Sequence, residues 1–309
     1  MLVGSVLDPE SETTEVDGSH PTAWQLGRDR SIDLSTPCVM GILNATPDSF
    51  HDGRSDFMNT EHLLEHGLSM LREGACIIDV GGESTRPGSN RVDSLEQCRR
   101  TTPLIRELAI RDSALLSIDT THARVAEAAL DAGAVIVNDV SGGTEDPALL
   151  SLVAERGCGI VLMHRLAPPG SDVYSDQYRS DPDYGTGGVV SAVQESLQVR
   201  MEAALSAGIE PAQVLLDPGL GFGKSVEQNL ELIRGLSQLR SNLGRPLLVG
   251  ASRKSFIGAL LGGRPPSERL FGSLVVAVRA VEAGASVIRT HDVGSTIDSL
   301  EVARAIGRT

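Results

Sequence analysis

The sequence has few aromatic residues and few basic ones. Phe, Trp and Tyr make up 3 % of its 309 residues, so the hydrophobic core has to be built mainly from Val, Ile, Leu and Ala. Lys and Arg number 27 against 41 Asp and Glu, which gives a formal net charge of −14 at pH 7. This balance predicts no basic surface for nucleic acid and no polybasic contact with a membrane.

Cysteine is also scarce and scattered. Cys38, Cys76, Cys98 and Cys158 form neither a CxxC pair nor a cluster with histidines, which argues against a zinc site or a redox dithiol. Buried free thiols fit a reducing compartment. The sequence has no apolar run of 18 or more residues and no basic segment ahead of an apolar one at its start. We therefore expect no membrane span and no secretory signal, and we expect a cytoplasmic protein.

Short apolar, β-branched runs alternate with segments of helical spacing along most of the chain. Eight continuously apolar runs predict strands buried on both faces, at residues 38–43, 76–80, 115–118, 134–137, 159–163, 214–216, 247–250 and 286–288. Helical spacing predicts helices at residues 61–72, 94–109, 122–132, 146–155, 189–207, 226–239, 268–283 and 295–306. This alternation predicts a single α/β domain, a closed (β/α)8 TIM barrel, with a doubly wound open sheet as the alternative.

Two segments lie outside this alternation. Residues 1–22 are acidic and rich in Ser and Thr, which predicts a flexible tail ahead of a barrel domain over residues 23–309 that starts with a short hairpin. The longest irregular segment, residues 165–188, holds all three tyrosines together with several Asp, Gly and Pro residues. We expect a long, mobile loop there, which is either functional or a solvated insertion.

Polar or ionisable groups follow all eight predicted strands. They lie at residues 44–50, 81–88, 119, 138–139, 164, 217–224, 252–255 and 289–291. The carboxyl ends of barrel strands converge on one face, where active sites of this fold lie. A single Asp after a strand is usually a helix cap or a turn residue. Eight such positions together favour an active site.

The charges of these residues predict two subsites. Arg86, Arg289 and His291 would gather anionic oxygens, with Asn44 as a neutral ligand and with amide donors from a helix that opens near residues 294–295. A phosphate or diphosphate would suit this group. Asp119, Asn138 and Asp217 would accept hydrogen bonds from a flat heterocycle rich in N–H donors. The alternatives are surface salt bridges for the arginines, and braces between loops for Asp119 and Asn138.

Two other patterns carry less weight. Residues 218–225, PGLGFGKS, nearly match a phosphate-binding P-loop, but Pro218 stands where the first glycine is required. His62 and His66 are four residues apart on a predicted helix. Without a third ligand they are interpreted as surface residues rather than a metal site.

Several motifs resemble those of the dihydropteroate synthase family, the folate-pathway enzymes that sulfonamides inhibit. In chain order they read GILNATPDSF, GGESTRPG, SIDT, VNDVSGG, LMH, LDPGLGFGK, GASRKSFIG and RTHDV, from about Trp24 to the C-terminus. The resemblance implies a (β/α)8 barrel, usually a homodimer formed through late helices. It implies a transferase that joins 6-hydroxymethyl-7,8-dihydropterin diphosphate to p-aminobenzoate, with Mg²⁺ on the diphosphate.

The resemblance also implies a role for individual residues. Pterin-binding residues would be Asp119, Asn138, Val140, Met163, Asp217, Phe222 and Lys254. Diphosphate-binding residues would be Asn44, Arg86, Arg289 and His291, with Asn44 also as the Mg²⁺ ligand. Residues around p-aminobenzoate would be Phe50, Thr85, Pro87, Arg253 and Ser255. Asp119, Lys254 and Arg289 would act in catalysis.

Two departures and two alternatives remain. The family often has Ser-Asp-Gly-Gly after the first Phe, whereas residues 51–54 here read HDGR. The segment after His164 is also longer than usual. A pterin-dependent methyltransferase barrel would share the pterin pocket, but it has no diphosphate to hold. A non-catalytic pterin-binding paralogue is disfavoured because the residues implied for the diphosphate and for p-aminobenzoate are retained.

Overall fold

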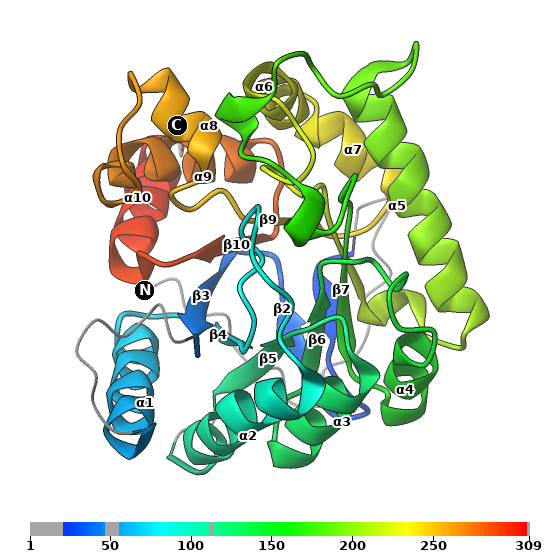
Figure 1. Ribbon diagram of the computed structural model, residues 1–309, viewed down its shortest axis with the longest axis vertical. Helices are drawn as coiled ribbons and strands as arrows, with labels where there is room; N and C mark the ends of the chain where they lie inside the picture. The colour runs from blue at the N-terminus through cyan, green and yellow to red at the C-terminus, as the bar shows by residue number, and fades with distance from the viewer. Residues whose placement is uncertain (1–20, 47–55, 112–113, 308–309) are drawn as a thin grey trace.

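The computed structural model describes residues 21–46, 56–111 and 114–307, so residues 1–20 of the expected tail and Phe50 lie outside the described residues. Eight parallel strands form the centre of the molecule (Figure 1). They are β3 (Cys38–Asn44), β4 (Ile77–Gly81), β5 (Leu115–Asp119), β6 (Ile136–Asp139), β7 (Gly159–Met163), β8 (Val214–Asp217), β9 (Leu248–Val249) and β10 (Val287–Thr290).

The strands follow the order β8-β7-β6-β5-β4-β3-β10-β9. A parallel bridge between Leu216 and Leu247 joins the two ends of this series, and the Leu216 amide donates to the carbonyl of Pro246 over 3.1 Å. The sheet is therefore closed. The predicted (β/α)8 barrel is confirmed, and the alternative of an open doubly wound sheet is wrong.

Helices surround the strands (Figure 1). They are α1 (Asp56–Arg72), α2 (Ser94–Arg111), α3 (Ala123–Ala132), α4 (Leu149–Arg156), α5 (Gly188–Ser206), α6 (Val226–Arg234), α7 (Leu236–Leu243), α8 (Ser255–Leu260), α9 (Leu270–Glu282) and α10 (Val293–Ile306). Short 3-10 turns are η2 (Pro169–Ser171), η3 (Ser175–Gln177), η4 (Pro211–Gln213) and η5 (Pro266–Glu268). None of the helices in the described part of the chain is both long and apolar enough to cross a membrane.

One predicted helix is divided in two. The segment 226–239 forms α6 and α7, which meet at Gly235. A Cβ at this position would lie 2.9 Å from a methyl group of Val190 on α5. The glycine therefore permits close packing against α5, and it carries a helix propensity lower than alanine's by about 1 kcal/mol. Helical spacing continues on both sides of Gly235, so the spacing alone does not predict that the helix ends there.

The core has two large apolar layers. One lies between the strands and the surrounding helices, and the other fills the barrel interior at the amino ends of the strands. An antiparallel hairpin of β1 (Ala23–Gln25) and β2 (Ser31–Asp33) covers this second layer. Trp24 is fully buried there, and its indole N–H donates to the carbonyl of Gln213 over 2.8 Å. The hairpin thus covers the end of the barrel where the strands begin, and a site would lie at the other end, where the strands finish.

Candidate active site

The strand register places the predicted polar residues at one level of the barrel. Asn44 of β3 pairs with Gly81 of β4, and Gly81 pairs with Asp119 of β5. Asp119 pairs in turn with Asn138 of β6, while Asp217 of β8 pairs with Met163 of β7. Because all these strands run parallel, their carboxyl ends lie at the same end of the barrel. Segments that are far apart in sequence therefore meet there, as the pattern of polar residues predicts.

The acceptors at this end are buried. The side chains of Asp119, Asn138 and Asp217 have exposed fractions of 7 % or less. Burial raises the pKa of Asp119 to about 7, against the opposing effect of the Arg289 guanidinium. Burial also raises the pKa of Asp217, although its Oδ1 accepts from the Gly219 amide over 2.7 Å. Such carboxylates are costly to keep charged without donors, and a ligand rich in N–H groups would supply donors.

Sequence reasoning missed Asp79, which lies at the centre of this network. It is fully buried in β4, and its Oδ2 accepts from the amide of Asn138 over 2.9 Å and from Arg289 Nε over 2.7 Å. Its Oδ1 has no hydrogen-bond partner among the residues that the structure describes. The available signal was an Asp inside a strand that is otherwise continuously apolar, because a buried carboxylate requires a partner.

Arg289 lies with the acids rather than apart from them. Its Nη2 donates to Asp119 Oδ2 over 2.8 Å, in addition to its bond with Asp79. The expected division into a cationic and an acidic group is therefore incomplete, because one guanidinium joins both. The side chain of Arg289 is still 18 % exposed and lines the cavity described next.

A cavity of about 540 Å³ opens at this end of the barrel. Of the residues predicted for the site, it is lined by Asn44, Thr85, Arg86, Pro87, Phe222, Arg253, Lys254, Ser255, Arg289 and His291. The buried pterin-group residues Asp119, Asn138, Val140, Met163 and Asp217 do not line it, and Arg289 bridges from the cavity to Asp119. Val140, Met163 and Phe222 form one small apolar cluster of their own.

Lys254 lies over an aromatic face. Its ammonium is 4.0 Å from the ring centroid of Phe222 and donates to the carbonyl of Leu220. Burial lowers its pKa to about 8, with Asp217 acting in the opposite direction. Gly221 permits this approach, since a Cβ there would lie 2.6 Å from Lys254 Cδ and its φ is +78°. The glycine-rich segment after β8 therefore makes room for the Lys254 side chain and is not a phosphate-binding P-loop.

His291 differs from the cation that its position suggested. Burial lowers its pKa to about 3, and the Arg289 and Arg253 guanidiniums add to this effect. The imidazole is neutral at pH 7, with Nδ1 3.0 Å from Ser252 Oγ. It can still donate one N–H to an anionic oxygen.

The expected helix-terminus donors are partly engaged. The Gly294 amide donates to Glu73 Oε2 over 3.0 Å, and α10 begins one residue earlier at Val293. That amide therefore does not face the cavity as an open anion site. Arg253 has its guanidinium paired with Asp292, and Ser255 Oγ accepts from the Ser175 amide over 3.0 Å.

His62 and His66 also line the cavity, from the α1 side. Their interpretation as simple surface residues is therefore incomplete, although both are exposed. Burial lowers the pKa of His66. Among the described residues, no group of three or more His, Cys, Asp and Glu side chains is placed to hold a metal ion.

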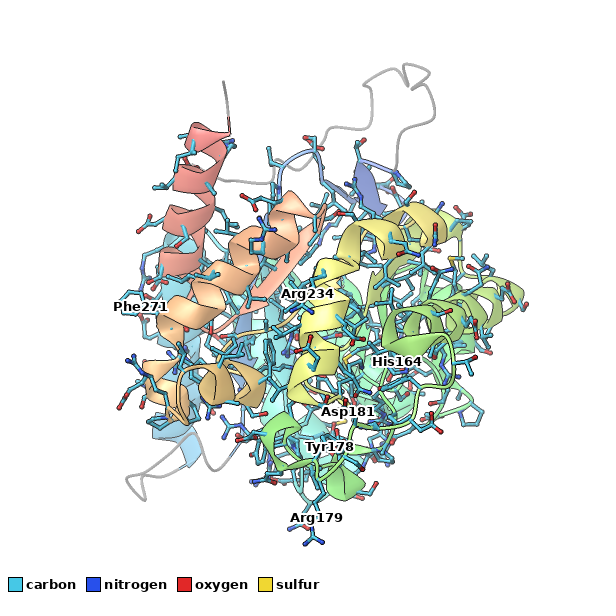
Figure 2. All side chains as sticks on the ribbon, turned by 90° about the horizontal axis from the view of Figure 1, so that it is seen from above. His164, Tyr178, Arg179, Asp181, Arg234 and Phe271 are labelled. Atoms are coloured by element: carbon cyan, nitrogen blue, oxygen red, sulfur yellow. The ribbon has the colours of Figure 1, made fainter. Side chains whose placement is uncertain are left out.

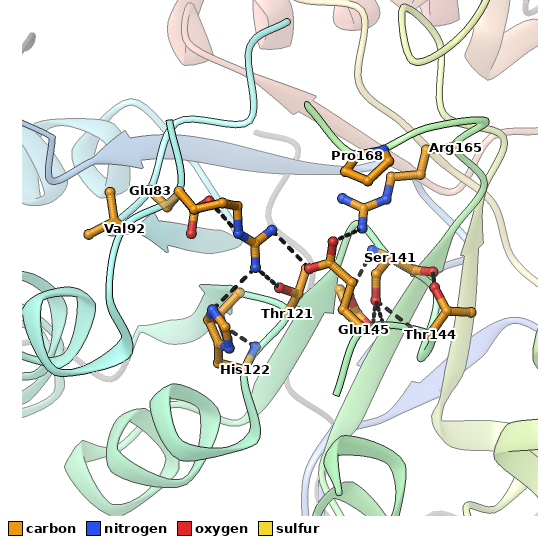
Figure 3. Close-up of polar contacts among 12 residues, drawn as sticks. Glu83, Val92, Thr121, His122, Ser141, Thr144, Glu145, Arg165 and Pro168 are labelled. Atoms are coloured by element: carbon orange, nitrogen blue, oxygen red, sulfur yellow. Dashed lines mark hydrogen bonds and ion pairs between the residues drawn. The ribbon is translucent and has the colours of Figure 1, made fainter. Parts of the chain in front are cut away.

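The loop after β4 is fastened to its neighbours by Arg91 (Figure 3). This guanidinium contacts Glu83, Glu145, Thr121 and His122 at distances of 2.8–3.2 Å. The contacts tie residues 82–93 to the loops that follow β5 and β6. The same loop carries the cavity-lining Thr85, Arg86 and Pro87.

The segment after β8 holds a buried lysine that sequence reasoning did not single out. Lys224 is fully buried, and its Nζ donates to the carbonyls of Gly219 and Phe222, each over 2.9 Å. Its third contact is Nδ1 of His164 at 2.9 Å. Burial lowers the pKa of Lys224 to about 7 and that of His164 to about 2, so His164 is neutral and accepts. The lysine thus shapes the turn that carries Phe222.

The predicted long loop is not a loosely solvated insertion. Residues 165–187, which we call the strap, carry the turns η2 and η3 and buried side chains at Asp172 and Ser175. The Gly88 amide donates to the carbonyl of Pro169 over 2.8 Å, so the strap (green in Figure 1) lies against the loop after β4 (cyan). Composition predicts an irregular segment, which is confirmed, but it does not show these specific anchors. Figure 2 shows Arg179 pointing away from the protein on its outer side.

Comparison with known proteins decides the family. A family model described as "Pterin binding enzyme" matches residues 40–291. The chain is 44 % identical to the dihydropteroate synthase of Mycobacterium leprae, with 89 % of this chain and 95 % of that one covered. It is 40 % identical to the dihydropteroate synthase of Escherichia coli K12, with 89 % and 93 % covered.

This chain belongs to the dihydropteroate synthase family of pterin-binding enzymes. It is therefore an enzyme, a transferase of folate biosynthesis. A solved dihydropteroate synthase of Xanthomonas albilineans with 4-aminobenzoic acid superposes with a TM-score of 0.82 at 39 % identity, covering 94 % of this chain and all of that one. One from Yersinia pestis in a sulfonamide complex gives 0.82 at 40 % identity, with the same coverage.

Proposed function

We propose that the cavity joins 6-hydroxymethyl-7,8-dihydropterin diphosphate to p-aminobenzoate, releasing diphosphate and forming 7,8-dihydropteroate. The observation that carries this assignment is that buried carboxylates and cavity-lining cations are connected through one residue. Arg289 links the buried Asp79 and Asp119 to a cavity that also presents Arg86 and Lys254. A ligand with a donor-rich ring at one end and a diphosphate at the other matches that order of charges.

The pterin would lie at the buried end. The Asp119 and Asp217 carboxylates would accept from its polar edge, and the Asn138 amide would bond to the same edge, while Val140 and Met163 would cover its ring. Lys254 and Phe222 would close the pocket from the cavity side, because the Lys254 ammonium lies over the Phe222 ring there. The apolar walls would then orient a flat ring and exclude water around the buried carboxylates.

Diphosphate departure develops two opposite charges. The C–O bond breaks with its electron pair going to diphosphate, and the positive charge left on the methylene group spreads into the pterin ring. Asp119 would stabilise that charge, whereas Arg86 and Arg289 would stabilise the leaving anion. His291 would add one neutral donor. The arylamine nitrogen then bonds to the methylene carbon and loses a proton.

The second substrate would lie toward the mouth. Thr85, Pro87, Arg253 and Ser255 line the cavity there and would surround p-aminobenzoate. Phe50, which the resemblance also assigns to this subsite, lies outside the described residues. An arylamine is a weak neutral nucleophile, so holding it against the methylene carbon matters more than a strong base.

Mg²⁺ is proposed to arrive on the diphosphate with Asn44 as its protein ligand. Asn44 Oδ1 and Asp119 Oδ2 both lie within 4 Å of the point where a Cβ would stand at Gly81, so the amide oxygen faces the same end of the barrel. Mg²⁺ commonly takes few protein ligands and keeps waters and phosphate oxygens, so one amide oxygen fits such a role. Bound there, the ion would neutralise charge on the leaving diphosphate.

A direct assay tests the reaction. Purified protein with both substrates and Mg²⁺ should release diphosphate and form dihydropteroate, detected by phosphate release after pyrophosphatase and by chromatography. A protein that binds the pterin but releases no diphosphate would be the non-catalytic paralogue. Replacing Mg²⁺ by excess chelator should abolish turnover while free pterin still binds.

We also propose a homodimer that works in the cytoplasm. Phe271 and Val275 of α9 and Val302 and Ile306 of α10 are large apolar side chains with exposed fractions of at least 60 %. Figure 2 shows Phe271 at the outer edge of the molecule. Burying such side chains favours association of two copies. Light scattering should give twice the chain mass, and Phe271→Glu should give a monomer.

A further inference from the structure

The strap presents one aromatic side chain to the cavity. Tyr174 lines the cavity together with Phe222, Arg253 and Ser255, and it is 37 % exposed. The whole chain has only nine aromatic residues apart from histidine, and among those that the structure describes Tyr174 and Phe222 line the cavity. A large exposed aromatic ring at the mouth of a cavity is a common means of contacting a ligand.

Two buried anchors fix the backbone on either side of Tyr174. Two residues earlier, Asp172 Oδ2 accepts from the Gly223 amide over 2.8 Å, and its Oδ1 accepts from the hydroxyl of Tyr178. Directly after Tyr174, the Ser175 amide donates to Ser255 Oγ over 3.0 Å. The exposed fractions of Asp172 and Ser175 are 6 % and 3 %, so both anchors are shielded from water.

The second anchor is itself held from a different element. Ser175 Oγ accepts from the Nδ2 atom of Asn229 on α6 over 3.1 Å, and the same Nδ2 atom lies 2.7 Å from the carbonyl oxygen of Ser225. Tyr184 adds a hydrogen bond from its hydroxyl to the carbonyl of Gly223 over 2.8 Å. The strap is therefore fastened to the loop after β8 at two points, to the start of α8 at a third and to α6 at a fourth. Tyr174 has little backbone freedom.

These anchors determine which end of the cavity Tyr174 faces. Its chain neighbour Ser175 bonds to Ser255, and Ser255 with Arg253 lines the part of the cavity proposed above for p-aminobenzoate. Because the amine of p-aminobenzoate has to face the pterin, its para carboxylate points away from the pterin. The pterin lies at the opposite, buried end. A tyrosine held beside Ser255 meets whatever extends from the arylamine carboxylate toward solvent.

We propose that Tyr174 is a specificity-determining residue for the second substrate, and that it limits the size of the group attached beyond the arylamine ring. The inference rests on the proposed function, because it takes the position of the arylamine from it. A ring on a fixed backbone gives contact area at a small cost in conformational entropy. It favours a compact benzoate and obstructs a longer amide of the same amine.

The test compares two arylamines in four proteins. Wild type, Tyr174→Ala, Tyr174→Phe and Val173→Ala are assayed with p-aminobenzoate and with p-aminobenzoylglutamate, and KM for the pterin diphosphate is measured in each. Val173 is the matched control, since it lies next to Tyr174 on the strap and is exposed but does not line the cavity.

We expect Tyr174→Ala to raise KM for p-aminobenzoate several-fold and to shift the ratio of the two kcat/KM values toward the longer amine by about tenfold, which corresponds to about 1.4 kcal/mol. KM for the pterin diphosphate should change less than twofold. Tyr174→Phe should keep the wild-type ratio, because the ring and not the hydroxyl forms the wall. Val173→Ala should behave as wild type.

Three outcomes would overturn the inference. An unchanged ratio in Tyr174→Ala in an active enzyme would show that the ring does not limit the second substrate. If Tyr174→Ala raised KM for p-aminobenzoate and KM for the pterin diphosphate equally, the strap would only support the fold. A wild-type protein that turns over neither arylamine would instead remove the proposed function, and this inference with it.

Discussion

Arg289 of β10 and Asp119 of β5 form an ion pair inside the barrel, at the carboxyl ends of the strands, with 2.8 Å between Nη2 and Oδ2. The same guanidinium binds the fully buried Asp79, so one cation serves two carboxylates. Removing one member of such a buried group leaves the others without compensation, which costs about 3–5 kcal/mol. The residue expected to bind the diphosphate therefore also maintains the floor of the proposed pterin site, which Asp79 and Asp119 form.

Arg289→Ala should weaken two ligands, not one. Loss of the guanidinium removes a donor to the diphosphate and leaves Asp79 and Asp119 unpaired in the pocket floor. We expect reduced affinity for the pterin diphosphate and also for the free hydroxymethylpterin, measured by calorimetry. Arg86→Ala is the control, since Arg86 lines the cavity without a bond to the floor acids. It should weaken the diphosphate alone, and normal binding of the free pterin by Arg289→Ala would contradict this account.

Pterin binding should weaken as the pH falls below neutrality. Burial raises the pKa of Asp119 to about 7, and only the ionised carboxylate accepts hydrogen bonds at both oxygens. Below that pH the ionised fraction falls about tenfold per unit, so the dissociation constant of free pterin should rise between pH 7 and pH 5. Isothermal titration at several pH values measures this. Asp119→Asn should bind more weakly and lose the pH dependence over that range, whereas a retained dependence would assign it to another group.

The same raised pKa affects stability with a definite sign. Between its ordinary value near 4 and about 7, the folded state holds a proton on Asp119 that the unfolded chain has released, so the free energy of unfolding should fall as pH rises through this window. The Asp119→Asn variant should not show that contribution in urea unfolding at pH 5 and pH 7.

Much of the barrel could be predicted from sequence because its strands are buried on both faces and so remain continuously apolar. Periodicity does not show that the sheet is closed by the Leu216–Leu247 bridge, because it identifies strands and not which strands pair. The site was harder. Asp79 sits inside an apolar run, and its partner Arg289 is 210 positions away. A pattern of neighbours cannot show such a pairing.

Composition predicts the irregular structure of the strap but not its anchors. Gly, Pro and Asp in residues 165–188 predict an irregular, mobile loop, which is correct for its secondary structure. Its order comes from single hydrogen bonds, such as that of Asp172 with the Gly223 amide, and no local propensity encodes them. The neutral state of His291 was also not predictable, because its lowered pKa depends on burial beside Arg289.

Lys224→Met should change the pH dependence of stability. Burial lowers the pKa of this lysine to about 7, so above that pH the folded state has released a proton that the unfolded chain keeps up to about 10. Wild-type stability should therefore gain up to about 1.4 kcal/mol per pH unit from this group between pH 7 and pH 9. Urea unfolding of the methionine variant should show a slope smaller by about that amount.

Near neutral pH, Lys224→Met should also be less stable than the wild type. The carbonyls of Gly219 and Phe222 would lose their donor, which costs about 1–3 kcal/mol for a buried group. Arg234→Met removes an exposed ion pair with Glu227 and should change neither the slope nor the stability appreciably. An Lys224→Met protein with the wild-type pH slope would show that Lys224 stays charged in the folded state.

Arg91→Ala should separate arylamine binding from pterin binding. The guanidinium joins Glu83 of its own loop to Glu145 and Thr121 of neighbouring loops, so its loss frees the segment that carries Thr85, Arg86 and Pro87 (Figure 3). We expect KM for p-aminobenzoate to rise several-fold while calorimetry gives an unchanged affinity for free pterin.

Stability should change little in this variant, because the Arg91 side chain is 41 % exposed and such ion pairs contribute about 0–1 kcal/mol. Arg99→Ala is the matched control, since Arg99 forms an exposed pair with Glu96 on α2 away from the cavity. It should leave KM for both substrates unchanged. If Arg91→Ala lowered the affinity for free pterin as much as for p-aminobenzoate, Arg91 would support the whole mouth of the barrel rather than the loop after β4.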